Sequence, residues 1–234
     1  MKLITNRVAK MSKVLLSAAL TVAIAVSLTG CSSNEPAKSS GTTSAPVASS
    51  EKAVSQTNPI IIDKVAKTVK VYTEVNGKYF VEPTRHGVVF KDGSNGSKSV
   101  LKAWGNQNDF YNALTTIGAK PGNNLKLDSV GVAVEGDPLD VSITWDGAGK
   151  ELPFGDAILD STKKNFDFRF GGNQENAKAK NTGCILCLDS CPVGITSNAA
   201  HPTKDFDNKI AEFKGNNKVL PADGTPVVVT FKLK

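Results

Sequence analysis

The sequence predicts a single, mainly β domain over residues 59–234, with an α+β arrangement as the alternative. Two observations support this prediction. Apolar and polar side chains alternate through most of the region, which is typical of strands with one buried face. Only one stretch has the three-and-four spacing of an amphipathic helix. We therefore expect one short helix, and we expect the cysteines to lie in a long loop.

The first strands are predicted from this alternation and from turn residues. Val69, Val71 and Val75 share one face of a strand in the sequence K-T-V-K-V-Y-T-E-V. Asn76-Gly77 is a strong hairpin signal and predicts a partner strand from Lys78 to Val81. Two more short strands, 87–90 and 99–104, are expected on either side of the polar turn at 92–97.

The expected helix begins near Asn106 or Asn108, because either side chain can cap a first turn. It ends at Gly118, and Pro121 follows. Its apolar residues at helical spacing are Phe110, Ala113, Leu114 and Ile117.

Alternation resumes after the helix and predicts strands over 139–145, 166–170 and 227–233. Residues 181–200 hold every cysteine of the domain and lie between polar segments, so we expect them to form a loop. Loops of this length are uncommon in compact domains unless they are functional or cross-linked.

Residues 1–30 are predicted to be a lipoprotein signal peptide. Basic residues precede the apolar segment Val14–Leu28, which is too short to span a bilayer comfortably. Leu28-Thr29-Gly30-Cys31 then resembles the bacterial lipobox, which implies that Cys31 carries acyl chains such as palmitate. We therefore expect a lipid-anchored protein on the extracytoplasmic face of a bacterial cell membrane.

Residues 31–58 are expected to be the lipidated cysteine and a disordered, serine-rich tether, since they contain almost no large apolar side chain. Loss of the signal peptide removes four basic residues and no acidic one, so the formal net charge falls from +6 to about +2. This balance gives no support for a nucleic-acid partner.

Cys184, Cys187 and Cys191 form the one cluster of chemically active residues in the domain. A C-x2-C step presents two soft thiolates to one centre, which suits zinc, copper(I) or an iron-sulfur cluster. The spacing also matches the end of the bacterial ferredoxin run, with Asn181 at the place of its first cysteine. A fourth ligand would have to come from His201 or His86, the two histidines of the chain.

Two other interpretations of these cysteines stay open. Outside the cytoplasm, neighbouring cysteines often form a disulfide, which would leave one of the three thiols unpaired. Alternatively, all three thiols are inert.

Two stretches together resemble the YdjY-domain proteins of bacteria. The first runs from P-T-R-H-G-V-V-F at 83–90 to I-G-A-K-P-G-N-N at 117–124, and the second is G-C-I-L-C with S-C-P and G-I-T-S-N at 183–198. The resemblance covers most of residues 60–234 and implies a ferredoxin-like, electron-transferring protein with an iron-sulfur cluster. Because the signal has no twin-arginine pair, zinc or copper captured after export is the alternative.

The sequence thus predicts a membrane-anchored extracytoplasmic protein with a three-cysteine redox or metal centre, which exchanges electrons with membrane redox proteins. A carrier or accessory role is favoured over an enzymatic one, because hydrolase motifs such as G-x-S-x-G and H-E-x-x-H are absent from the sequence. The alternative is a non-catalytic binding or scaffolding lipoprotein whose cysteine loop is held by a disulfide.

Overall fold

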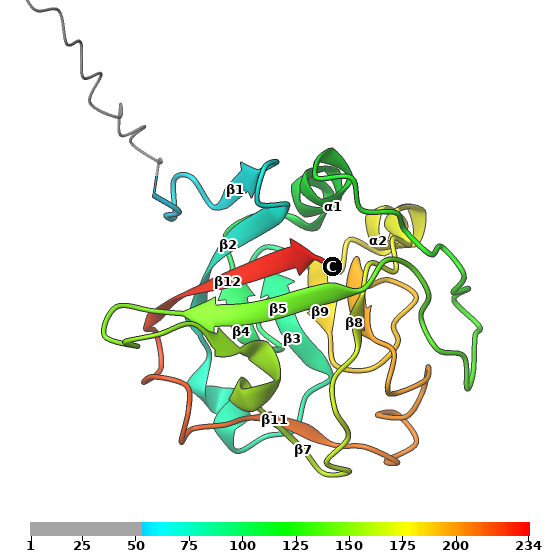
Figure 1. The fold of residues 1–234 in the computed structure, drawn as a ribbon. Coiled ribbons are helices and arrows are strands. Elements are labelled where there is room, and N and C mark those ends of the chain that lie inside the picture. The colour runs from blue at the N-terminus through cyan, green and yellow to red at the C-terminus, as the bar shows by residue number, and fades with distance from the viewer. Residues whose placement is uncertain (1–52) are drawn as a thin grey trace, which may run out of the picture. The chain divides into compact units, whose positions relative to one another are not determined.

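The computed structural model describes residues 53–234, and most of its strands belong to one large, curved β-sheet (Figure 1). The strands are β1 (Ile60–Asp63), β2 (Thr68–Val75), β3 (His86–Phe90), β4 (Ser99–Ala103), β5 (Leu139–Thr144), β6 (Leu152–Pro153), β7 (Ile158–Asp160), β8 (Phe168–Arg169), β9 (Cys184–Cys187), β10 (Thr196–Asn198), β11 (Phe213–Gly215) and β12 (Pro226–Leu233). The sheet order is β6-β5-β12-β2-β4-β3-β9-β10-β8, and β1 pairs with β2 beside this path. The prediction of a mainly β domain is confirmed.

Strand β2 shows why this sequence forms a sheet with one buried face. Its residues alternate strictly between half-buried and buried, as the period-two pattern predicts. Val71 of β2 is paired with Val229 of β12, and both are fully buried. Such cross-strand pairs of branched side chains stabilise the sheet and fix its register.

The sheet curls until its two ends meet. Pro138, directly before β5, forms a bridge with Arg169 of β8, and the backbone N–H of Phe170 donates to the carbonyl of Asp137 at 2.9 Å. The result is a nearly closed barrel whose interior is filled by side chains. The largest fully buried side chains are Phe110, Phe154, Phe170, Phe213, Phe231, Leu101, Leu114, Ile143, Ile185, Leu186, Leu188 and Ile195.

Helix α1 (Gln107–Thr116) confirms the helix expected from the sequence. The side chain of Asn106 caps it by accepting hydrogen bonds from the N–H groups of Asn108 and Asp109. The ring of Phe110 packs edge-on against Phe231 of β12, with ring centroids 4.6 Å apart. The helix therefore covers the barrel with its apolar face.

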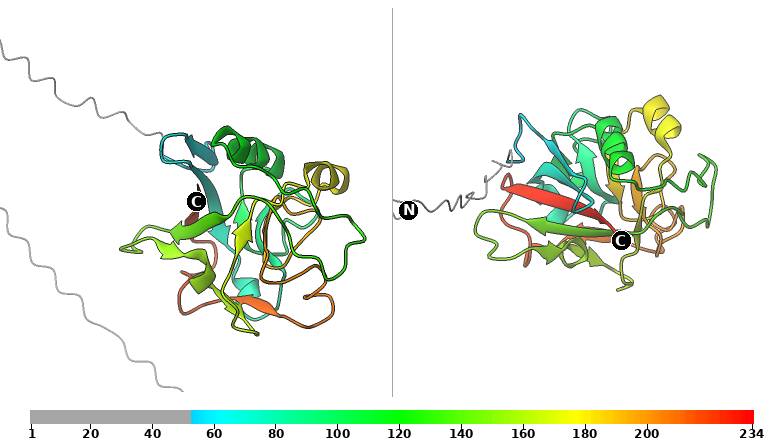
Figure 2. Two further views of the ribbon diagram at one scale, coloured as in Figure 1. Left: turned by 45° about the vertical axis from the view of Figure 1, so that its right-hand side comes forward. Right: turned by 45° about the horizontal axis from the view of Figure 1, so that its top comes forward.

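A second helix, α2 (Gln174–Lys180), was not predicted, and it lies beside α1 (Figure 2). The small sheet of β7 and β11 lies at the opposite end of the domain from the helices (Figure 1). Among the described residues, no helix has the length and apolar character needed to cross a bilayer.

The predicted hairpin at Asn76-Gly77 is wrong, because a 3-10 helix, η1 (Gly77–Phe80), follows β2 instead of a partner strand. The N–H of Gly77 donates to Asp223 at 2.8 Å, and the hydroxyl of the buried Tyr79 donates to the carbonyl of Ser97. These distant contacts hold the segment away from β2. A second 3-10 helix, η2 (Phe154–Ala157), precedes β7.

The cysteine segment also differs from the expected loop. Cys184–Cys187 forms strand β9, which lies between β3 and β10, and only Cys191 lies in the loop that follows. The strand expected over 166–170 is limited to β8. The predicted signal peptide, Cys31 and most of the tether lie outside the described residues, while Ser55 and Asn58, at the tether's end, form a bridge.

Candidate metal site

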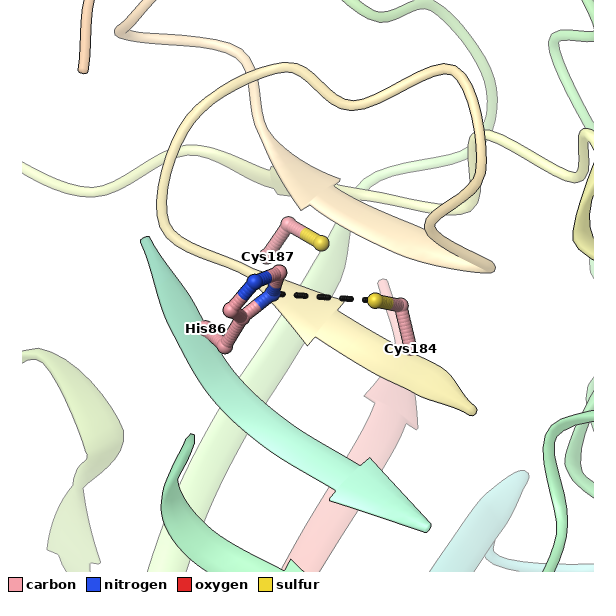
Figure 3. A group of neighbouring side chains, drawn as sticks. All are labelled: His86, Cys184 and Cys187. Carbon is pink, nitrogen blue, oxygen red and sulfur yellow. Dashed lines mark hydrogen bonds between the residues drawn. The ribbon is translucent and has the colours of Figure 1, made fainter. Parts of the chain in front are cut away.

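His86, Cys184 and Cys187 come together where β3 pairs with β9. His86 is the direct partner of Cys187, and Val89 is the partner of Cys184. Residues three apart on a regular strand point to opposite faces. Here the pairing register shifts between these partners, as at a β-bulge, and such irregularities re-aim side chains. In Figure 3 the three side chains point toward one another.

The three donor atoms lie close enough together to be candidate ligands of a single ion. Nδ1 of His86 lies 3.6 Å from Sγ of Cys184, and the nitrogen and both sulfur atoms lie within 4.8 Å of one another (Figure 3). Bonds of about 2.3 Å to sulfur and about 2.0–2.1 Å to nitrogen place tetrahedral ligands about 3.6 Å apart. Both cysteines are fully buried, whereas His86 is half-buried. The donors therefore fit one zinc or copper ion.

The turn between β3 and β4 supports Cys184 from one side. The side-chain amide of Asn95 donates to Sγ of Cys184 at 3.8 Å, and its backbone N–H donates to the carbonyl of Thr182. The turn can lie this close to residues 182 and 183 only because residues 93 and 183 are glycines. A Cβ on Gly93 would lie 2.6 Å from Cα of Gly183, and Gly183 itself has a φ of +79°. The turn thus packs backbone against backbone beside the site.

The thiols of Cys184 and Cys187 differ in acidity. Hydrogen bonds from the thiol of Cys187 and from the ring of His86 hold the pKa of Cys184 well below its usual range, despite its burial. The pKa of Cys187 is raised, first because its proton is held in the hydrogen bond to Cys184, and further by Cys191 and by burial. Of these two thiols, that of Cys184 therefore loses its proton at the lower pH. Binding of a metal would release the proton of Cys187.

An ion pair lies beside this group. Arg85 donates from Nε and Nη2 to the two carboxylate oxygens of Asp189, at 2.9 and 2.7 Å, and the carboxylate is fully buried. Burial raises the pKa of Asp189 to about 6, against the attraction of Arg85. Although burial alone would lower the pKa of Arg85, Asp189 and the thiols of Cys191 and Cys187 raise it above its ordinary value. The guanidinium therefore stays charged next to Cys187 and Cys191.

Cys191 belongs to the same buried cluster but not to the converging group. It packs with Val89, Cys184 and Cys187, and its thiol interacts with that of Cys187. Its loop is fixed by Asn173, whose side-chain amide donates to the carbonyls of Cys191 and Gly194 at 3.2 and 3.3 Å. All three cysteines are free thiols in this structure.

His201, predicted as a further ligand, does not join the site. Its Nε2 lies 2.9 Å from Asp160 and its Nδ1 lies 3.3 Å from Asp205. The ring is fully buried and packs edge-on against Phe213, with centroids 5.0 Å apart. Because both nitrogens face carboxylates, His201 joins β7 to the loop that precedes β11, and of the two candidate histidines only His86 lies among the cysteines.

Asn95, Arg85 and Asn173 were not identified from the sequence as parts of the site. Asn95 contacts Cys184 directly, Arg85 pairs with Asp189 beside the cysteines, and Asn173 fixes the loop of Cys191. Polar residues of these types also occur in ordinary turns, so they carried no distinct signal. The glycines at 93 and 183 indicate close backbone contacts, but they do not identify the contacting segment.

The fold and the site define a class: a β-barrel-like domain with a buried group of one imidazole and two thiols in its wall. Residues 60–232 match the family model of the YdjY domain, and the chain belongs to the YdjY-domain family. It is 44% identical over 182 residues to a protein of Escherichia coli (strain K12) described as uncharacterized protein YdjY. The match covers 77% of this chain and 81% of that protein. No solved structure matches the chain.

Proposed function

We propose that this protein binds one thiophilic transition-metal ion, zinc or copper(I), through His86, Cys184 and Cys187. The observation that carries the proposal is the convergence of two buried thiols and one imidazole within 4.8 Å. Thiolates and imidazole are the donors that both ions prefer in proteins. The ion pair beside the site supports the proposal, because the charged Arg85 offsets part of the negative charge of the thiolates.

A single ion suits this spacing better than the ferredoxin-type cluster expected from the resemblance. In a four-iron cluster each thiolate binds a different iron, so its ligand sulfurs are spread more widely than around one ion. Here both sulfurs lie within 4.8 Å of each other and of one imidazole nitrogen. With copper as the ion, the same residues would hold a one-electron carrier, which is the form of electron transfer that this geometry supports.

We also propose where the protein is located. The lipobox-like sequence that ends at Cys31 supports attachment to the extracytoplasmic face of the membrane by acyl chains. A redox-active form of the centre would then exchange electrons with membrane proteins.

The test is analysis of the full-length protein purified from membranes without oxygen. We expect about one zinc or copper ion per chain and no acid-labile sulfide, and we expect His86→Ala to lose most of this metal. His201→Ala is the matched control and should keep it, because both ring nitrogens of His201 face carboxylates.

Two results would reject the proposal. Iron with acid-labile sulfide would indicate a cluster. Metal-free protein with a disulfide and one titratable thiol among residues 184–191 would indicate the alternative, a binding or scaffolding lipoprotein with a cross-linked cysteine segment.

A further inference from the structure

Ser197 of β10 continues a row of paired residues that crosses the candidate site. His86 of β3 is paired with Cys187 of β9, and Cys187 is paired in parallel with Ser197. Directly paired residues on neighbouring strands project from the same face of a sheet. The row therefore puts an imidazole, a thiol and a hydroxyl side by side on one face.

The hydroxyl of Ser197 is buried and has no hydrogen-bond partner within residues 53–234. Its neighbours on β10 are satisfied: Thr196 donates to the carbonyl of Ile185 at 2.6 Å, and the amide of Asn198 donates to the carbonyl of Leu188 at 3.0 Å. Buried polar groups in folded proteins almost always have partners. An isolated hydroxyl at this position therefore points to a hydrogen bond that forms only when a neighbouring group changes.

The space beside Gly194 joins this hydroxyl to the site. A Cβ on Gly194 would lie 2.9 Å from Oγ of Ser197 and 3.0 Å from Sγ of Cys187. The oxygen and the sulfur therefore border the same small space, which stays open because residue 194 has no side chain.

We propose that Ser197 is a positioning residue of the metal site, and that its hydroxyl donates a hydrogen bond to the thiolate of Cys187 when Cys187 binds the ion. The inference rests on the proposed function. A metal-bound thiolate keeps lone pairs that accept hydrogen bonds, and such partners orient the ligand and strengthen metal binding.

The experiment compares full-length Ser197→Ala with wild type, with Zn²⁺ and Co²⁺ as the probes. Zinc affinity, measured by competition with a chelator, should fall by about 10- to 100-fold, as for other residues that support ligands. The thiolate-to-Co²⁺ charge-transfer band should move to longer wavelength, since the sulfur loses a donor. The melting temperature of the metal-free variant should not fall, because the hydroxyl makes no hydrogen bond there.

Thr196→Val is the matched control on the same strand. The hydroxyl of Thr196 donates a hydrogen bond to the carbonyl of Ile185. Its loss should therefore lower the melting temperature of the protein without metal and leave the Co²⁺ band unchanged. A Ser197→Ala protein with wild-type zinc affinity and an unshifted band would overturn the assignment of Ser197 while leaving the proposed function intact. A fall in metal-free stability like that of Thr196→Val would show that the hydroxyl is structural. Wild-type protein that binds none of Zn²⁺, Co²⁺ and Cu⁺ would overturn both proposals.

Discussion

His86 and Cys184 are 98 residues apart in the chain, yet Nδ1 of the histidine lies 3.6 Å from Sγ of the cysteine. The contact exists because β3 and β9 are neighbours in the sheet. The site therefore depends on correct pairing of two strands, and its ligands can be tested one at a time.

Replacement of Cys184 or Cys187 by Ser should remove most of the bound metal, because two remaining donors hold an ion poorly. Cys191→Ser is the control within the same cluster and should keep most of it, since its sulfur lies outside the converging group. Metal per chain in each purified variant is the measurement. Equal loss in all three would instead make Cys191 a ligand, as the sequence predicted.

His201→Ala should destabilise the domain by about 3–5 kcal/mol, because two buried carboxylates lose their shared partner and the ring leaves a cavity. Urea unfolding of the variant and the wild type measures the difference. A loss of metal without a loss of stability would show that His201 is a ligand and not a structural residue.

Gly93→Ala should destabilise the domain by about 1–3 kcal/mol, because its new methyl would meet the backbone of Thr182 and Gly183 at 2.6 Å. The displaced turn should also weaken metal binding by moving Asn95 away from Cys184. Gly155→Ala is the matched control, since its methyl would meet only the ring of Phe166. Comparable losses of stability in the two variants would contradict the backbone contact.

The pair of His201 and Asp160 predicts a loss of stability in acid. Burial alone would raise the pKa of Asp160, but hydrogen bonds from Thr162 and His201 lower it below its ordinary value of 3.8. The folded protein therefore protonates Asp160 less readily than the unfolded chain does. The stabilisation from this carboxylate is complete above pH 3.8 and is lost as the pH falls through the lowered pKa.

Asp160→Asn should flatten this acid part of the curve of unfolding free energy against pH. Urea unfolding at a series of pH values between about 5 and about 2 measures it. Parallel curves for the variant and the wild type would contradict the lowered pKa.

Cys31→Ala should release the protein from membranes, because the acyl chains are expected on this thiol. Fractionation of cells, with the mass of the protein in each fraction, measures the change. Full retention of the variant in the membrane fraction, with the same mass as wild type, would show that the anchor lies elsewhere.

Strand β2 was predictable from its strict alternation, and β12 from an apolar face that includes Val227, Val229 and Phe231, although Thr230 is buried as well. Helix α1 was predictable from its cap at Asn106 and its apolar stripe. Helix α2 was not, because it has seven residues, buries only Ala177, and lies between two asparagines with positive φ. The predicted hairpin failed because contacts with Asp223 and Ser97 outweigh the local preference of Asn76-Gly77.

The sequence identified the types of residue in the candidate site, but not which of these residues would lie together. Short spacing identified the three cysteines, and the scarcity of histidines limited the other candidates to His86 and His201. The choice between these two histidines depends on which strand lies beside β9 and on an irregular register within that pair. Neither follows from local sequence, because each depends on contacts between distant segments.

The pairing of β2 with β12 also determines when the barrel can form. The hydroxyl of Thr73 donates to the carbonyl of Val227, 154 residues later, and β12 lies between β5 and β2 in the sheet. The barrel therefore lacks one of its central strands until residues 226–233 have been delivered, and closure of such distant contacts is slow. If the chain is exported unfolded, the barrel closes only after almost the whole domain has crossed the membrane, and capture of an ion is then one of the last events in its maturation.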